Sequence, residues 1–165
     1  MRLEKVPSGC KVFIDTNIFL YDIAGHPVYG GSCKRFLKRL EIREIVGVTS
    51  VVVLNELLHK LILGEVSKRK GLTLSQGMEY IKKNPDVISS LKAYNIVGKI
   101  EGMGSLAIME LTPDIFAFAR GYMIKYKLMS NDAIHVATCK EHEIENIATN
   151  DADFERVGFL KVWKP

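Results

Sequence analysis

The segment Lys11–Tyr21, KVFIDTNIFLY, constrains the fold more than any other part of this sequence. Its opening apolar run, Val12–Ile14, has the length and the β-branched and aromatic content of a buried strand. Asp15, Thr16 and Asn17 follow, and all three residue types favour helix N-termini, so the strand should pass directly into a helix. Asp15 either caps this helix or lies at the carboxyl edge of a sheet, where open α/β sheets bind ligands.

The length and composition of the chain favour one globular domain spanning residues 1–165. These residues suffice for one full core, and 47% of them are hydrophobic while 25% are charged. The net charge of +4 tolerates a nucleic-acid partner without requiring one. The three cysteines form no CxxC pair, so we expect neither a disulfide framework nor a zinc site, and a cytoplasmic location. We also expect no signal peptide and no membrane span.

A second strand-to-helix junction is predicted around residues 44–56. The apolar run 44–48 is a strand candidate, and Thr49–Ser50 would cap a helix over 51–63 that ends at Gly64. Glu56 lies in the first turns of that helix. A glutamate on a surface helix is ordinary, but this one would lie near the carboxyl edge of the sheet.

Two later junctions carry acids in equivalent places. The strand candidate 105–111 precedes a helix capped by Thr112, and Ser130 or Asn131 would cap the next helix, which carries Asp132 in its first turn. The helix dipole alone favours an acid there. The strand candidate 146–149 runs into a loop with Asp151 and Asp153, and residues 159–163 form a last strand.

Two other segments carry charge or helix signals without a clear role. Residues 65–102 indicate a helical arm or insertion, with helices beginning at Thr73 and after Pro85. A helix over 32–44 is amphipathic, and its polar face is basic. That face is either a solvated surface or a patch that contacts RNA phosphates. It consists of Lys34, Arg35, Lys38 and Arg39.

Acids at four such junctions gather at one edge if the strands are parallel. Carboxylates crowded in a cleft repel one another unless a cation lies among them. Mg²⁺ or Mn²⁺ prefers carboxylate and water oxygens, and such ions support phosphodiester hydrolysis. The chemistry therefore favours a metal-dependent nuclease, provided that the acids converge in space.

Four stretches of the chain, in order, resemble the PIN-domain ribonucleases, and in particular the VapC-like toxins of toxin–antitoxin pairs. They are FIDTNIFLY, TSVVVLNELLHKL, LMSNDAIHVATCKEH and IATNDADFERV. The resemblance implies a three-layer α/β/α sandwich around a mainly parallel sheet, with Mg²⁺ or Mn²⁺ held by acids. Residues 65–102 are long for a compact toxin, which leaves a role in RNA processing or decay open.

The resemblance also assigns roles to individual residues and partners. It implies that Asp15, Glu56, Asp132 and Asp151 are the metal-binding quartet, with Asp153 as an auxiliary ligand. Thr16, Asn17 and Thr149 match polar positions that orient carboxylates and waters. We expect an RNA substrate, a homodimer and, for a toxin, a small antitoxin that blocks the cleft. A PIN-like module that binds RNA or protein without cutting is the alternative.

Two further interpretations fit the sequence less well. Glu56 with His59, and Asp132 with His135, have the i, i+3 spacing of di-iron helical bundles, but that fold needs four long helices. A haloacid-dehalogenase-type phosphatase needs a second aspartate two residues after the first, where this chain has Asn17. We expect both histidines to be packed or surface residues.

Overall fold

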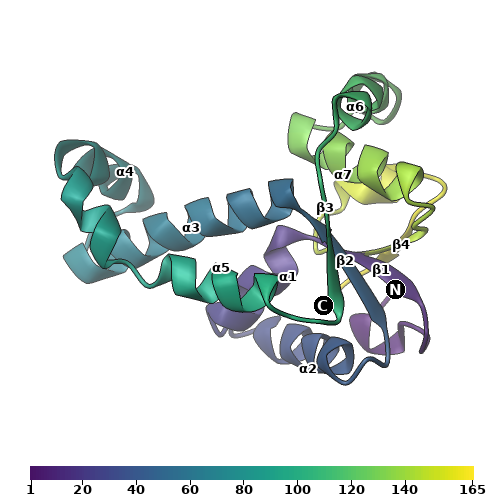
Figure 1. Cartoon of the computed structure of the whole chain (residues 1–165), viewed down its shortest axis with the longest axis horizontal. Helices are drawn as coiled ribbons and strands as arrows, with labels where there is room; N and C mark the ends of the chain where they lie inside the picture. The colour runs from purple at the N-terminus through teal and green to yellow at the C-terminus, as the bar shows by residue number, and fades with distance from the viewer.

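The computed structural model covers all 165 residues and contains one five-stranded sheet in the order β3-β2-β1-β4-β5 (Figure 1). All neighbouring strands are parallel. The strands are β1 (Lys11–Ile14), β2 (Val46–Ser50), β3 (Leu106–Met109), β4 (Asn146–Ala148) and β5 (Lys161–Trp163). Because β1 has a neighbour on each edge and lies between helical layers, Val12–Ile14 are completely buried.

Helices cover the sheet on both sides, which confirms the predicted α/β/α architecture. They are α1 (Thr16–Ile23), α2 (Gly30–Glu41), α3 (Val51–Lys70), α4 (Leu74–Lys83), α5 (Ala93–Glu101), α6 (Pro113–Tyr126) and α7 (Ser130–Glu141). Helix α1 packs against α2 and α3, and α3 packs against α5. Helices α6 and α7 pack together on the other side (Figure 1). No helix is both long enough and apolar enough to cross a membrane.

Gly47 allows α2 to approach β2 closely. A Cβ atom at this position would lie 2.5 Å from Cδ1 of Leu40 and 3.1 Å from Cδ1 of Leu106. Leu40 is completely buried and has no room to move away. The glycine is therefore required for packing between this helix and the sheet.

The predicted helix end at Gly64 is wrong, because α3 continues to Lys70 and ends at Gly71 in the left-handed conformation with φ of +66°. A glycine inside a helix costs only about 1 kcal/mol. The packing of α4 on the end of α3 offsets that cost, since Ser67 is buried against Gly77. The predicted arm therefore begins as a continuation of α3, and it projects away from the sheet (Figure 1).

The rest of the arm has the helical character that its sequence predicts. Thr73 caps α4, as predicted, in a reciprocal capping box with Gln76. The helix predicted after Pro85 is a 3-10 turn, Pro85–Ser90, and α5 begins only at Ala93. The carboxylate of Glu65 accepts hydrogen bonds from the backbone N–H of Lys92 and Ala93, which ties α5 to α3.

Other predicted boundaries shift by a few residues. Strand β2 begins two residues later than predicted and includes Thr49 and Ser50, although Ser50 still caps α3. The cap predicted for α7 is wrong: Ser130 is already helical, and Met129 precedes the helix without a side-chain cap. The backbone carbonyl of Met129 accepts the first helical hydrogen bond, from Ala133 N–H, at 3.0 Å. Thr112 caps α6 as predicted.

Candidate active site

Asp15 is the most deeply buried acid of the candidate site. It follows β1 directly, caps α1 and is 7% exposed. Its Oδ1 accepts a hydrogen bond from the backbone N–H of Thr16 at 2.6 Å. Its Oδ2 accepts hydrogen bonds from Thr149 Oγ1 at 2.6 Å and from Asn17 Nδ2 at 2.5 Å. Burial raises the pKa of this carboxyl group, and the nearby His135 and the hydrogen bonds from Thr149 and Thr16 oppose that rise.

Parallel pairing of β1 with β4 brings the second loop beside Asp15. Ile14 pairs with Ala148, and the N–H of Asp15 donates to the carbonyl of Ala148 at 3.0 Å. The next residue, Thr149, is completely buried, and its Oγ1 also accepts a hydrogen bond from the N–H of Asp151 at 3.0 Å. One hydroxyl group therefore joins the loops that carry two of the predicted metal ligands.

Asn17 provides a second connection between the same two loops. Its Oδ1 accepts a hydrogen bond from the N–H of Asn150 at 3.0 Å, and its Nδ2 lies 3.1 Å from Thr149 Oγ1. Thr16 is also buried, and its hydroxyl group lies close enough to Glu56 to lower the pKa of that carboxylate. The three polar residues predicted to orient the acids therefore do surround Asp15.

Asp151 and Asp153 lie in the loop after Thr149. Asp151 is exposed, and its Oδ1 accepts a hydrogen bond from the N–H of Asp153 at 2.8 Å. The carboxylate of Asp153 instead forms an ion pair with Arg156. Asp151 is therefore the member of this pair whose carboxylate is not engaged by a basic residue.

Glu56 reaches the site from the second turn of α3, which begins directly after β2. Its side chain is 26% exposed, and its Oε1 lies 2.6 Å from Nζ of Lys60. Burial alone would raise the pKa of Glu56, but the hydrogen bond and charge of Lys60 outweigh burial and lower it.

Asp132 is the acid of the site whose ionised form the folded protein disfavours most clearly. It lies in the first turn of α7 and is half-buried. Its pKa is raised to about 6, first by burial and then by four nearby carboxylates whose negative charges repel its ionised form. These carboxylates belong to Asp151, Asp15, Asp153 and Glu56. All five predicted acids therefore share one electrostatic environment at the carboxyl edge of the sheet.

The residues present suit a hard divalent cation. No three carboxylate, thiol or imidazole groups are arranged as ligands of one metal ion. Mg²⁺ does not require such a cage, since it usually binds one or two carboxylates and keeps several waters or substrate phosphate oxygens. The oxygen-only donors and the repulsion felt by Asp132 both fit an ion of this kind.

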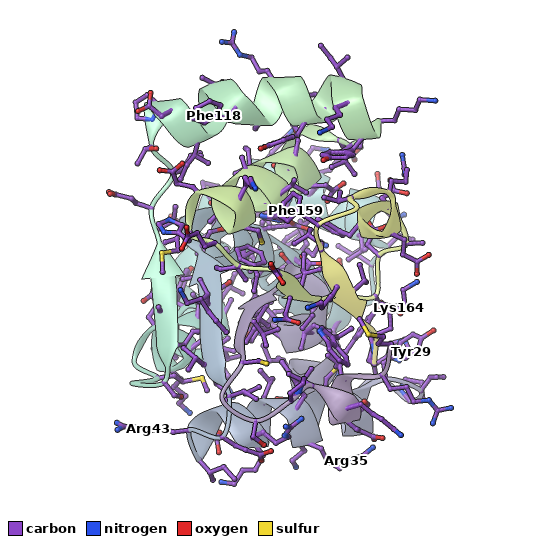
Figure 2. All side chains as sticks on the ribbon, turned by 90° about the vertical axis from the view of Figure 1, so that its right-hand side faces the viewer. Tyr29, Arg35, Arg43, Phe118, Phe159 and Lys164 are labelled. Atoms are coloured by element: carbon purple, nitrogen blue, oxygen red, sulfur yellow. The ribbon has the colours of Figure 1, made fainter.

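The predicted RNA-contacting face on α2 lies away from these acids. Arg35 is at the end of the molecule opposite α6 (Figure 2). It forms an ion pair with Glu4, while Lys38 pairs with Glu41 and Arg39 with Glu44. Lys34 is exposed. Three of the four basic residues therefore already have acidic partners within the protein.

His59 and His135 lie in different environments. His59 is exposed on α3. His135 is completely buried next to the rings of Phe13 and Phe154, and burial lowers its pKa. The negative charges of Asp15 and Glu56 act on His135 and oppose this lowering of its pKa. A neutral, packed His135 agrees with the expectation for this residue.

Sequence reasoning missed three residues that contact the site. Lys60 pairs with Glu56, and the i, i+4 spacing of a glutamate and a lysine on one helix could have predicted this contact. Arg156 forms an ion pair with Asp153, and the i, i+3 spacing of these two residues could have predicted that contact in the same way. The hydroxyl of Tyr21 accepts a hydrogen bond from Asn150 Nδ2 at 3.2 Å. That contact joins distant segments, so no local signal predicts it.

The fold, the order of its strands and the acids at their carboxyl ends agree with the comparison of the sequence with known families. Residues 12–160 match the PIN domain family, so the chain belongs to the PIN-domain proteins. The chain is 33% identical to Ribonuclease VapC2 of Methanocaldococcus jannaschii over 163 residues, covering 98% of both chains. It is 28% identical to Ribonuclease VapC6 of the same organism, covering 95% of this chain and 99% of that one.

Solved structures show the same fold at lower sequence identity. The Mycobacterium tuberculosis toxin VapC20, described as cleaving the sarcin-ricin loop, superposes with a TM-score of 0.65 at 20% identity. The alignment covers 92% of this chain and 98% of VapC20. A chain of the VapBC2 complex of Rickettsia felis, solved with a promoter DNA fragment, gives a TM-score of 0.55 at 19% identity and covers 93% and 98% of the two chains.

Proposed function

We propose that this protein is a Mg²⁺- or Mn²⁺-dependent endoribonuclease that hydrolyses RNA phosphodiesters at the acid cluster. The observation that carries the proposal is the link between Asp15 and Asp151 through the hydroxyl group of Thr149. Asp15, Asp151 and Glu56 are also close enough to Asp132 for their charges to raise its pKa. Full-length similarity to two curated VapC ribonucleases supports RNA as the substrate.

We assign the residues of the cluster different tasks. Asp15, with both oxygens fixed by hydrogen bonds, would hold one or two ions together with Glu56, Asp132 and Asp151. Asp153 supports Asp151 through its backbone N–H. The bound ion supplies charge that stabilises the attacked phosphate and makes water a better nucleophile. No histidine is assigned as a base, since His135 is buried and His59 is exposed on α3.

We propose further that the protein is the toxin of a toxin–antitoxin pair. The structural neighbours include toxin–antitoxin complexes, among them one from Klebsiella pneumoniae that matches with a TM-score of 0.55 at 18% identity. A small antitoxin would then be the protein partner and would block the acid cluster. An RNA-processing or non-cutting role is the alternative, because the fold alone does not fix the biological role.

Cleavage assays with single-stranded and structured RNA in Mg²⁺, Mn²⁺ or EDTA test this proposal. The wild type should cut RNA only with a divalent ion, and Asp15→Asn and Asp132→Asn should each remove cleavage while remaining folded by circular dichroism. Asp86→Asn, an exposed aspartate in the arm, is the matched control and should cut normally. Absence of cutting with every RNA and ion would favour the non-cutting module.

A further inference from the structure

Lys60 forms an ion pair with Glu56, one of the proposed metal ligands. Its Nζ lies 2.6 Å from Oε1 of Glu56, and the two side chains are 44% and 26% exposed. Glu56 is the one acid within ion-pair distance of this lysine. A divalent ion bound by Glu56 would therefore meet a positive charge that already occupies the same carboxylate.

The other basic residue beside the cluster, Arg156, differs from Lys60 in how firmly it is held. The guanidinium group of Arg156 pairs with Asp153 and donates to the carbonyl of Lys127 at 2.6 Å and to that of Tyr126 at 3.3 Å. It therefore clamps the end of α6 to the loop after β4. Lys60 has a single partner on a flexible four-carbon stem, so its ammonium group can leave Glu56 without loss of any other hydrogen bond.

Lys60 lies about one helical turn beyond Glu56 on the same face of α3. Residues four apart lie on the same face of a helix, and the rise of 1.5 Å per residue puts Lys60 ~6 Å further along α3 than Glu56. An RNA chain whose phosphate is attacked next to Glu56 would pass this point with a neighbouring phosphate. A lysine released from Glu56 would then meet a phosphate oxygen, its usual anionic partner in nucleic-acid complexes.

We propose that Lys60 is an exchangeable cation, which neutralises Glu56 in the metal-free protein and moves to an RNA phosphate when a divalent ion binds. This inference rests on the proposed nuclease function. It makes the binding of metal and RNA mutually supportive, because the metal releases the charge that RNA requires. By thermodynamic linkage, RNA should then increase the affinity for the metal by the same factor.

The first test measures Mn²⁺ binding to the metal-free protein by electron paramagnetic resonance of the free ion. Lys60→Met keeps the length of the stem and removes the charge, whereas Lys60→Arg keeps the charge. The control Lys38→Met breaks a comparable exposed Lys–Glu pair on α2, at 2.8 Å. Because an exposed ion pair is weak, Lys60→Met should bind Mn²⁺ about two- to fivefold more tightly. The control and Lys60→Arg should bind as the wild type.

The second test compares RNA binding with and without metal. In EDTA, the affinity of Lys60→Met for a labelled oligoribonucleotide, read by fluorescence anisotropy, should equal that of the wild type, since Lys60 is then paired with Glu56. In Mn²⁺, its KM should rise about three- to tenfold, and the salt dependence of binding should fall by about one phosphate contact. If Lys60 only added positive charge to the surface, Lys60→Met would weaken RNA binding equally in both conditions.

Two results would overturn the inference. Unchanged Mn²⁺ affinity in Lys60→Met would mean that the lysine does not compete with the metal. Equal loss of RNA affinity in EDTA and in Mn²⁺ would mean that it is not exchanged. If the wild type cuts no RNA, the nuclease proposal fails separately, and anisotropy in Mn²⁺ then replaces KM as the measure of RNA binding.

Discussion

The hydroxyl group of Thr149 donates a 2.6 Å hydrogen bond to Oδ2 of Asp15, across the ends of two neighbouring parallel strands. The same oxygen accepts the N–H of Asp151. This contact connects residues that are 134 positions apart in the sequence. It fixes both the orientation of one carboxylate and the start of the loop that supplies another.

Thr149→Val should therefore damage metal binding more than folding. The substitution removes the donor to Asp15 and leaves the N–H of Asp151 without its partner, at a cost of about 1–3 kcal/mol in the free energy of unfolding. Loss of an orienting hydrogen bond typically lowers metal affinity about 10- to 100-fold. Urea unfolding and Mn²⁺ titration measure the two effects.

The control for this prediction is Thr138→Val. Thr138 is equally buried, but its hydroxyl donates to the carbonyl of Ile134 within α7, at 2.9 Å. The variant should change stability without changing Mn²⁺ affinity. Equal Mn²⁺ affinity in the wild type and Thr149→Val would contradict the role assigned to Thr149.

Asp132 should reduce the stability of the metal-free protein at neutral pH. Its pKa is about 6 in the folded state and near 3.8 when unfolded, so its favourable contribution is complete below pH ~4 and is lost as the pH rises through 6. Because the side chain is half-exposed, we expect Asp132→Asn to stabilise the apoprotein at pH 7.5 by only about 1 kcal/mol. Urea unfolding at pH 7.5 and pH 4 in EDTA should show the gain at the higher pH alone.

A saturating divalent ion should reverse this order of stability. The wild type binds the ion with Asp132 and gains stability from it, whereas Asp132→Asn gains less. A stabilisation of Asp132→Asn that is equal at both pH values would mean that repulsion among the carboxylates is not its cause.

Gly47→Ala and Gly64→Ala should change stability in opposite directions. The added methyl group at Gly47 meets the side chains of Leu40 and Leu106 and should destabilise the protein by about 1–3 kcal/mol. The added methyl group at Gly64 meets nothing within 4 Å and should stabilise α3 by about 0.5–1 kcal/mol. Thermal unfolding of the two variants beside the wild type measures both. A neutral Gly47→Ala would show that β2 and α2 are less tightly packed than described.

The homodimer expected from the sequence remains a prediction, and α6 is the surface on which we would test it. This helix buries Ile115 and Ala119 but exposes Phe118 by 60% and Ile124 by 83% (Figure 2). Apolar residues on several sides of one helix usually indicate a covering partner, and a second copy related by a two-fold axis would supply the same helix. We expect Ile124→Glu to be monomeric by light scattering.

Ile42→Glu is the control for the dimer, because Ile42 is 62% exposed at the end of α2. This variant should have the mass of the wild type. A monomeric wild type at all concentrations, or a dimeric Ile124→Glu, would exclude a dimer through α6.

Most of the acids were predictable from the sequence because Asp15, Glu56 and Asp151 each follow a strand closely, whereas Asp132 follows helix α6. Asp15 has a short buried strand before it and capping residues after it, and both are local signals. Parallel pairing then brings the junctions together without any further information, as the contact of Thr149 with Asp15 illustrates. The α/β/α layers were predicted through the resemblance to PIN-domain ribonucleases.

The helix end at Gly64 was not predictable, because the packing that decides it is not local. Whether a glycine stops a helix depends on how the residues beyond it pack, and here Ser67 is buried against Gly77 of α4. The cap of α7 failed similarly: Ser130 has the right residue type, but the backbone enters the helix at Met129. The basic face of α2 could not be interpreted alone, since its partners Glu4 and Glu44 lie outside the helix.

The strand order has a consequence for the synthesis of this protein on the ribosome. The central strand β1 emerges first, but its neighbour β4 is formed by residues 146–148, near the end of the chain. Until then, β1 has one unpaired edge, Asp15 lacks the hydroxyl of Thr149, and Asp151 has not been translated. A nascent chain therefore exposes a strand edge that can pair with another chain. It carries no complete acid cluster, so any cutting of RNA begins only after nearly the whole protein has been released.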